Sequence, residues 1–159
     1  MYQFSNLNNN QILSNLFISA LPISFIAGNM IININILLII LSTLFLYRKD
    51  FFTIKLYYLD KFLITFFFLI LITGIYNDIS ININNKIFSE YRGIFYTTFK
   101  SVLFLKYLFL YFSIRYLVEK NILNFKLFYS ICAISSLFVC FDLLIQFIFG
   151  KDIFGFPAN

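Results

Sequence analysis

Long apolar runs recur along this chain, and they restrict its fold more than any other feature of the sequence. From residue 127 to 149 the only charged side chain is Asp142, and most of the other residues are apolar. A run of about 20 such residues spans the hydrocarbon core of a bilayer as an α-helix. Further apolar runs precede it, and the sequence therefore predicts five membrane-spanning helices, at 12–28, 30–47, 62–76, 99–118 and 127–149.

The composition of the whole chain agrees with lipid as its main solvent. Hydrophobic residues make up 61% of the 159 residues and charged residues only 12%, with a mean hydropathy of +0.87. A soluble domain usually has about a quarter of its residues charged, and it could not bury this much apolar surface. We therefore predict an all-α fold, a polytopic membrane helix bundle that forms a single membrane domain over residues 1–159.

Helix-breaking residues and polar links set the expected boundaries between the spans. Pro22 is expected to kink the first span because it removes one backbone hydrogen bond, and Gly28 with Asn29 is expected to form a tight break before the second. Residues 48–61 are predicted to lie outside the hydrocarbon as an interfacial helix, with aromatic side chains facing lipid. Residues 77–93 are predicted to form an exposed loop because most of them are polar or glycine.

The distribution of Lys and Arg between the links predicts the orientation of the chain. The segment 48–61 carries four basic residues, and Arg115, Lys120 and Lys126 surround the link between the fourth and fifth spans. The segment 77–98 carries only two basic residues, together with two acidic ones. Because basic residues concentrate in cytoplasmic loops, we expect the N-terminus in the cytoplasm and the C-terminus on the opposite side of the membrane.

Several classes of function lack the residues that they need. The chain contains no His, so it cannot complete His-based catalysis alone. Cys132 and Cys140 lie eight residues apart in an apolar run, where we expect them to pack as small hydrophobes. No phosphate-binding glycine loop, zinc-ligand spacing or nucleophile motif is present, and the basic residues form no nucleic-acid-binding patch. We therefore expect the lipid bilayer as a partner, and no cofactor, metal or nucleic acid.

A few polar residues lie inside the predicted spans. Asp142 and Gln146 are four residues apart and share one helix face, where they can hydrogen-bond to each other. An unpaired carboxylate in hydrocarbon costs about 2.5 to 3.5 kcal/mol, so Asp142 is expected to face the bundle or a wet cavity. Lys106 would lie at a similar depth in the fourth span and could pair with it. Two interpretations stay open, a pair that fixes helix packing and a contact on a substrate path. Gly74 is expected to permit close helix approach.

The residues after Gln146 extend this polar pair into a longer pattern. The pattern is D-x-x-x-Q-x-x-x-G-x-D-x-F-G, and it is matched by Asp142, Gln146, Gly150, Asp152, Phe154 and Gly155. It resembles the membrane segment of the O-antigen ligase and O-antigen polymerase superfamily of bacterial envelope proteins. The early stretch LPISFIAGNMIININILLIILSTLFL and the basic Lys106 in the fourth span are also similar to that superfamily.

This resemblance implies a glycosyltransferase of the bacterial inner membrane that acts in lipopolysaccharide biosynthesis. Such a protein transfers a glycan from undecaprenyl diphosphate to lipid A core or to a growing chain, without a metal or nucleotide. Superfamily members continue into further spans and a periplasmic loop whose Arg and His residues act in transfer. The resemblance thus implies that residues 1–159 are an N-terminal portion, inactive alone, whose missing spans could lie on a separate chain. It assigns no catalytic residue to this portion.

Two other interpretations compete with the transferase. The chain could be a small non-enzymatic integral membrane protein that serves as an assembly partner or as a subunit of a complex. Half of a transporter is less favoured, because no span has the Gly/Pro-interrupted centre that is typical of a substrate-binding broken helix.

Overall fold

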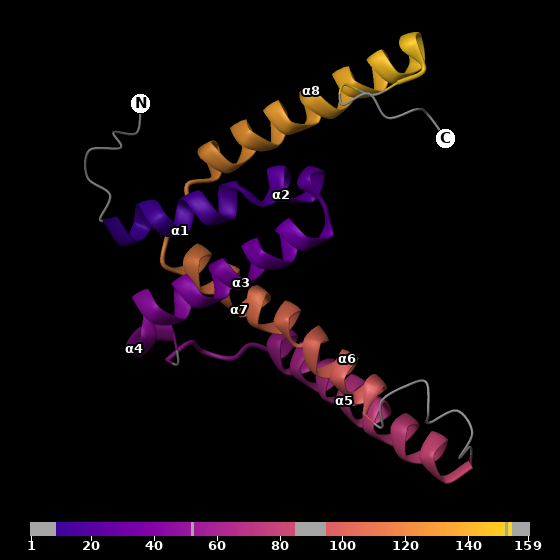
Figure 1. Ribbon diagram of the computed structural model, residues 1–159. Coiled ribbons are helices and arrows are strands. Elements are labelled where there is room, and N and C mark those ends of the chain that lie inside the picture. Colours follow the sequence, from indigo (N-terminus) through magenta and orange to yellow (C-terminus); the bar gives the residue numbers. More distant parts are fainter. Residues whose placement is uncertain (1–8, 52, 85–94, 152, 154–159) are drawn as a thin grey trace. The chain divides into compact units, whose positions relative to one another are not determined.

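The computed structural model describes residues 9–51, 53–84, 95–151 and 153, and these residues are mostly helical (Figure 1). The all-α prediction is confirmed. Within these residues, five helical stretches are long and apolar enough to cross a membrane: Asn9–Ala27, Asn29–Leu46, Tyr58–Ser80, Tyr96–Glu119 and Phe125–Phe149. Each overlaps one of the five predicted spans, although several boundaries differ. The chain divides into two compact units, Met1–Leu46 with Leu117–Asn159 and Tyr47–Tyr116.

The first unit contains α1 (Asn9–Ser19), α2 (Leu21–Ala27), α3 (Asn29–Leu46) and α8 (Phe125–Phe149). Both α1 and α2 contact α3 and α8, and Figure 1 shows α2 running beside each of them. Its buried apolar side chains include Ile18, Ile36 and Ile39. Polar side chains join the same helices, since the Asn35 amide donates a hydrogen bond to Ser24 Oγ at 2.7 Å.

Buried Asn15 links α1 to the turn before α8. Its side chain is 4% exposed. Its Nδ2 donates to the carbonyl oxygen of Ile122 at 2.8 Å, and its Oδ1 accepts from the backbone N–H of Asn124 at 2.6 Å. Asn124 then caps α8, because its side chain accepts a hydrogen bond from Leu127 N at 3.2 Å. One amide of α1 therefore fixes the residue at which α8 begins.

The break expected at Gly28 is confirmed, and the kink expected at Pro22 stays a prediction. The helical stretch is interrupted at Ala20. Pro22 lies in the first turn of α2, where a backbone N–H has no acceptor within the helix, so proline loses no hydrogen bond there. Gly28 has a φ of 106°, a conformation that side chains rarely adopt, and α3 begins at the next residue. Backbone sterics at Gly28 explain why the sequence predicted this break.

The second unit contains α4 (Arg48–Phe51), α5 (Tyr58–Asn84), α6 (Tyr96–Phe104) and most of α7 (Lys106–Glu119). Its main contact joins α5 to α6, which lie side by side in Figure 1. The pairing is closest at Gly74, where an added Cβ would collide with Ser101 Oγ and lie 2.9 Å from Ser101 Cβ. The expected role of Gly74 in close helix approach is therefore confirmed.

Two predicted segments differ from the structure. The loop predicted at 77–93 is wrong in its first half, because α5 continues to Asn84. Asp78 lies inside this helix, and its carboxylate accepts the backbone N–H of Thr97 at 3.1 Å and of Thr98 at 2.7 Å. These N–H groups lie in the first turn of α6, where they have no hydrogen-bond acceptor within the helix. A polar residue that was predicted to lie in a loop therefore makes its hydrogen bonds from within a helix.

The interfacial helix predicted at 48–61 is wrong in its middle part. In the described part of this segment, α4 and the first residues of α5 are helical, whereas residues 54–57 have no helical conformation. Phe51 is buried and its ring centroid lies 5.9 Å from that of Tyr116, whereas Tyr57 and Tyr58 are exposed. The next helix begins only at Tyr58, where Asp60 supplies a strong N-terminal hydrogen bond.

The fourth predicted span has an interruption that its sequence did not indicate. Leu105 separates α6 from α7, and its N–H bonds to Val102 O at 3.1 Å. Leu108 N likewise bonds to Leu105 O at 3.0 Å, so the turn is tightened towards 3₁₀ geometry. The backbone of Leu105 keeps helical angles, φ −57° and ψ −21°, and the two helices together form one span-length stretch.

Candidate functional site

A buried carboxylate lies at the start of α5. Asp60 is 1% exposed. Its Oδ2 accepts the backbone N–H of Tyr57 at 2.5 Å, while the Tyr57 carbonyl accepts the N–H of Lys61 at 3.2 Å. Asp60 therefore bonds back to the residue that caps its helix, as in one half of a capping box. A negative charge is also favourable at this end of the helix dipole.

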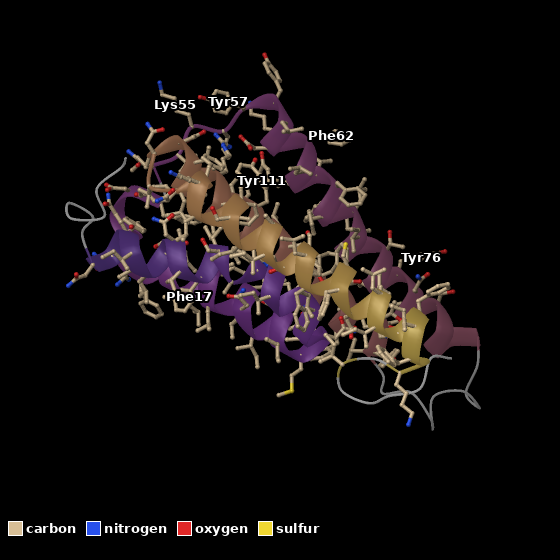
Figure 2. All side chains as sticks on the ribbon, turned by 90° about the horizontal axis from the view of Figure 1, so that it is seen from above. Phe17, Lys55, Tyr57, Phe62, Tyr76 and Tyr111 are labelled. Carbon is tan, nitrogen blue, oxygen red and sulfur yellow. The ribbon has the colours of Figure 1, made fainter. Side chains whose placement is uncertain are left out.

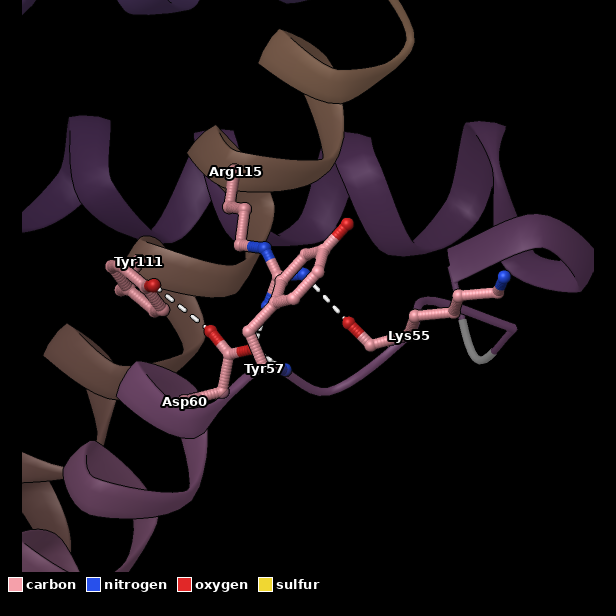
Figure 3. A network of polar contacts seen from close by, with 5 residues as sticks. All are labelled: Lys55, Tyr57, Asp60, Tyr111 and Arg115. Carbon is pink, nitrogen blue, oxygen red and sulfur yellow. Dashed lines mark hydrogen bonds and ion pairs between the residues drawn. The ribbon is translucent and has the colours of Figure 1, made fainter.

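Two side chains of α7 complete the surroundings of Asp60. Arg115 forms an ion pair with Asp60 Oδ2 through Nη1. The Tyr111 hydroxyl donates a hydrogen bond to Asp60 Oδ1 at 2.9 Å. Since Tyr111 and Arg115 are four residues apart, they lie on one face of α7, and Figure 3 shows both directed at the carboxylate. The start of α5 is thereby joined to α7.

Arg115 also holds the non-helical segment that precedes α5. Its Nη2 donates to the carbonyl oxygen of Lys55 at 2.6 Å (Figure 3). Its guanidinium carbon lies 4.7 Å from the centroid of the Tyr57 ring, within the range of a cation–π contact. The Arg115 side chain is only 11% exposed. We call these five residues, Lys55, Tyr57, Asp60, Tyr111 and Arg115, the Asp60 network.

The Asp60 network is suited to positioning and not to catalysis. Both carboxylate oxygens of Asp60 accept hydrogen bonds, and the Arg115 guanidinium compensates the charge. A base or a metal ligand would need one of these oxygens released, which costs free energy in a buried site. Among the described residues, no group of three or more His, Cys, Asp or Glu side chains could hold a metal ion. The network therefore fixes backbone segments against one another.

Three residues of the sequence pattern lie together at the end of α8. Gly150 ends the helix in the left-handed conformation, φ 68° and ψ 11°, and donates its N–H to Gln146 O at 2.9 Å. Asp142 Oδ1 accepts the backbone N–H of Ile153 at 2.8 Å. Asp142 thus reaches past the end of its own helix and holds the chain that follows Gly150. Its predicted side-chain bond to Gln146 stays a prediction.

The other residues that the sequence singled out belong to the second unit or lie outside the described part of the chain. Lys106 is the first residue of α7, and its Nζ lies 5.0 Å from the Tyr107 ring centroid. It belongs to the second unit and Asp142 to the first, so their pairing stays a prediction. The remaining pattern residues lie outside the described part of the chain: Asp152, Phe154 and Gly155.

The Asp60 network was not predicted from the sequence, although a usable indication was present. Asp60 precedes the third apolar run closely, and Arg115 lies near the end of the fourth. Consecutive spans run in opposite directions, so these two ends fall on the same side of a membrane, and opposite charges there can pair. The same reasoning applies to Asp78, near the end of α5, and the backbone at the start of α6.

Comparisons of the chain with protein-family models, with curated proteins and with solved structures gave no significant match.

Proposed function

We propose that this chain is the N-terminal membrane portion of an O-antigen ligase-like glycan transferase. Its substrate would be a glycan linked to undecaprenyl diphosphate, used in lipopolysaccharide biosynthesis at the bacterial inner membrane. The N-terminus would lie in the cytoplasm and the C-terminus in the periplasm. The five apolar helices and the pattern that begins at Asp142 support this proposal.

The hydrogen bond between Ile153 N and Asp142 Oδ1 carries the proposal. It gives the spacing of the pattern a physical reason. Gly150 turns the chain away from α8 with positive φ, and the acid two turns earlier then holds that chain close to the helix. In a transferase, a fixed exit of this kind would position the segment that follows at the membrane surface. The diphosphate of a lipid-linked glycan lies at the same level, and precise positioning of a site requires such rigid support.

A second candidate is a non-enzymatic integral membrane protein that acts as an assembly or complex subunit. It is favoured by the Asp60 network, in which a buried acid, a guanidinium and a phenol all take part in contacts that hold the fold. A protein whose polar groups serve its own packing needs no substrate chemistry.

The test is deletion of the gene, followed by electrophoresis of lipopolysaccharide. In a strain without a second ligase, deletion should remove the glycan side chains, and the native gene should restore them. Asp142→Leu should restore them poorly because a leucine cannot accept the Ile153 N–H, whereas Asp142→Asn keeps an acceptor oxygen and should restore more. Membrane abundance of each variant, measured by immunoblot of a tagged protein, separates lost function from lost protein.

Unchanged side chains in the deletion strain would refute the transferase proposal. If a membrane partner also loses stability in that strain, the subunit candidate gains support.

A further inference from the structure

The segment that enters α5 presents cations and apolar side chains together. Lys55 and Lys61 are exposed. Between them, Leu56 is 52% exposed, Tyr57 59% and Tyr58 92%. Figure 2 places Lys55, Tyr57 and Phe62 at one end of α5, the end from which the apolar run starts. A water-facing loop does not usually expose so much apolar surface beside its charges.

The acidic residue of this segment does not lie on its surface. Asp60 is buried and paired with Arg115, so its negative charge does not face outward beside the two lysines. Figure 3 shows the Lys55 side chain directed away from Asp60, although the Lys55 carbonyl belongs to the Asp60 network. The other acid nearby, Asp50, is exposed on α4 and has Arg48 on the same short helix. The outward charge around Lys55 and Lys61 is therefore positive.

We propose that Lys55 and Lys61, with Leu56, Tyr57 and Tyr58 between them, form a docking surface for anionic phospholipid headgroups. The lysines would contact headgroup phosphates, and the tyrosines would lie at headgroup level, where aromatic side chains concentrate in membrane proteins. The Asp60 network holds this surface in place through the Lys55 carbonyl and the Tyr57 ring. The proposal goes beyond the transferase function and does not depend on it.

Lipid fits this surface better than a soluble anion does. A free phosphate would satisfy the lysines but would leave the neighbouring apolar side chains in water: Leu59 is 62% exposed and Phe62 is 69% exposed. An anionic phospholipid covers both kinds of group, because its headgroup meets the cations and its acyl chains meet the apolar run that follows. The positive charge and the exposed apolar side chains therefore both favour an anionic phospholipid.

The experiment measures phospholipid binding to the purified protein in neutral detergent by native mass spectrometry. Phosphatidylglycerol is the anionic probe and phosphatidylcholine is the neutral one. Lys55→Gln/Lys61→Gln should weaken phosphatidylglycerol binding about 30-fold, from the typical contribution of two basic residues near an anionic surface. Binding of phosphatidylcholine should not change. Lys55→Arg/Lys61→Arg should retain binding, since it keeps both charges.

The matched control is Lys100→Gln/Lys151→Gln, which removes the same charge from residues far from this segment in sequence. Far-ultraviolet circular dichroism checks that every variant is folded. Equal loss in the control would show a general charge effect and overturn the proposal. Unchanged phosphatidylglycerol binding in Lys55→Gln/Lys61→Gln would also overturn the proposal. If inorganic phosphate displaces phosphatidylglycerol at equal concentration, the ligand is a soluble anion and the proposed lipid surface is wrong.

Discussion

Replacement of Arg115 by Leu should destabilise the protein strongly, because it leaves the Asp60 carboxylate buried without a counter-charge. Asp60 is 1% exposed and would keep only two hydrogen bonds, from Tyr57 N and the Tyr111 hydroxyl. Removing one partner of a buried ion pair costs about 3 to 5 kcal/mol. The two remaining hydrogen bonds and the helix dipole offset part of this cost. We therefore expect a loss near the lower limit, about 3 kcal/mol.

Asp60→Asn gives a sharper test, because its effect on the free energy of unfolding should change sign between the native protein and the Arg115→Leu variant. In the native protein, Asp60→Asn removes one ion of the pair and should destabilise. In the Arg115→Leu background, the same change removes an uncompensated charge and should stabilise by about 1 to 2 kcal/mol, since an amide oxygen still accepts a hydrogen bond. The free energy of unfolding can be measured by titrating dodecyl sulfate into mixed micelles, with helix content as the readout.

The control for this cycle is Arg48→Leu, which removes a basic residue that is exposed on α4. It should change the free energy of unfolding little, because exposed charges contribute little to stability. If Asp60→Asn destabilises equally in the native and Arg115→Leu backgrounds, charge compensation at Asp60 is refuted, and the network would act through shape alone.

Three more changes test other contacts. Gly74→Ala should lower stability by about 1 to 3 kcal/mol, because its Cβ meets Ser101, and the added change Ser101→Gly should recover part of this loss in thermal unfolding. Asn15→Leu should cost about 1 to 3 kcal/mol by leaving buried backbone groups unpaired, measured by the same unfolding assay. Asp78→Ala should speed amide hydrogen exchange at the start of α6, whereas exposed Asp50→Ala should leave that exchange unchanged.

The sequence predicted the apolar helices well because lipid imposes a length requirement that each apolar run meets by itself. The start of α2 near Pro22 and the break at Gly28 were also predictable, since they follow from the backbone of single residues. No knowledge of a neighbouring helix was needed for either feature. These parts of the fold are local properties of the chain.

One error and one omission arose where a polar residue acts on a segment far away in sequence. Asp78 lies in a polar stretch that favours a loop, yet it belongs to α5 and accepts the N–H groups of Thr97 and Thr98 at the start of α6. Asp60 also acts on Arg115, 55 residues further along the chain. A hydropathy profile shows each of these acids only as a break in an apolar run, because the profile contains no information about the helix that the acid contacts.

Asp142 belongs to the same class of residue, and this bears on the two interpretations left open by the sequence. Asp60 and Asp78 both lie near a helix end; Asp60 accepts one backbone N–H group and Asp78 accepts two. Asp142 accepts Ile153 N beyond the end of α8, so its described contact is also with backbone at a helix end. This contact favours a role in holding the chain over direct contact with substrate. Any effect of Asp142 on glycan transfer would then act through the position of the segment after Gly150.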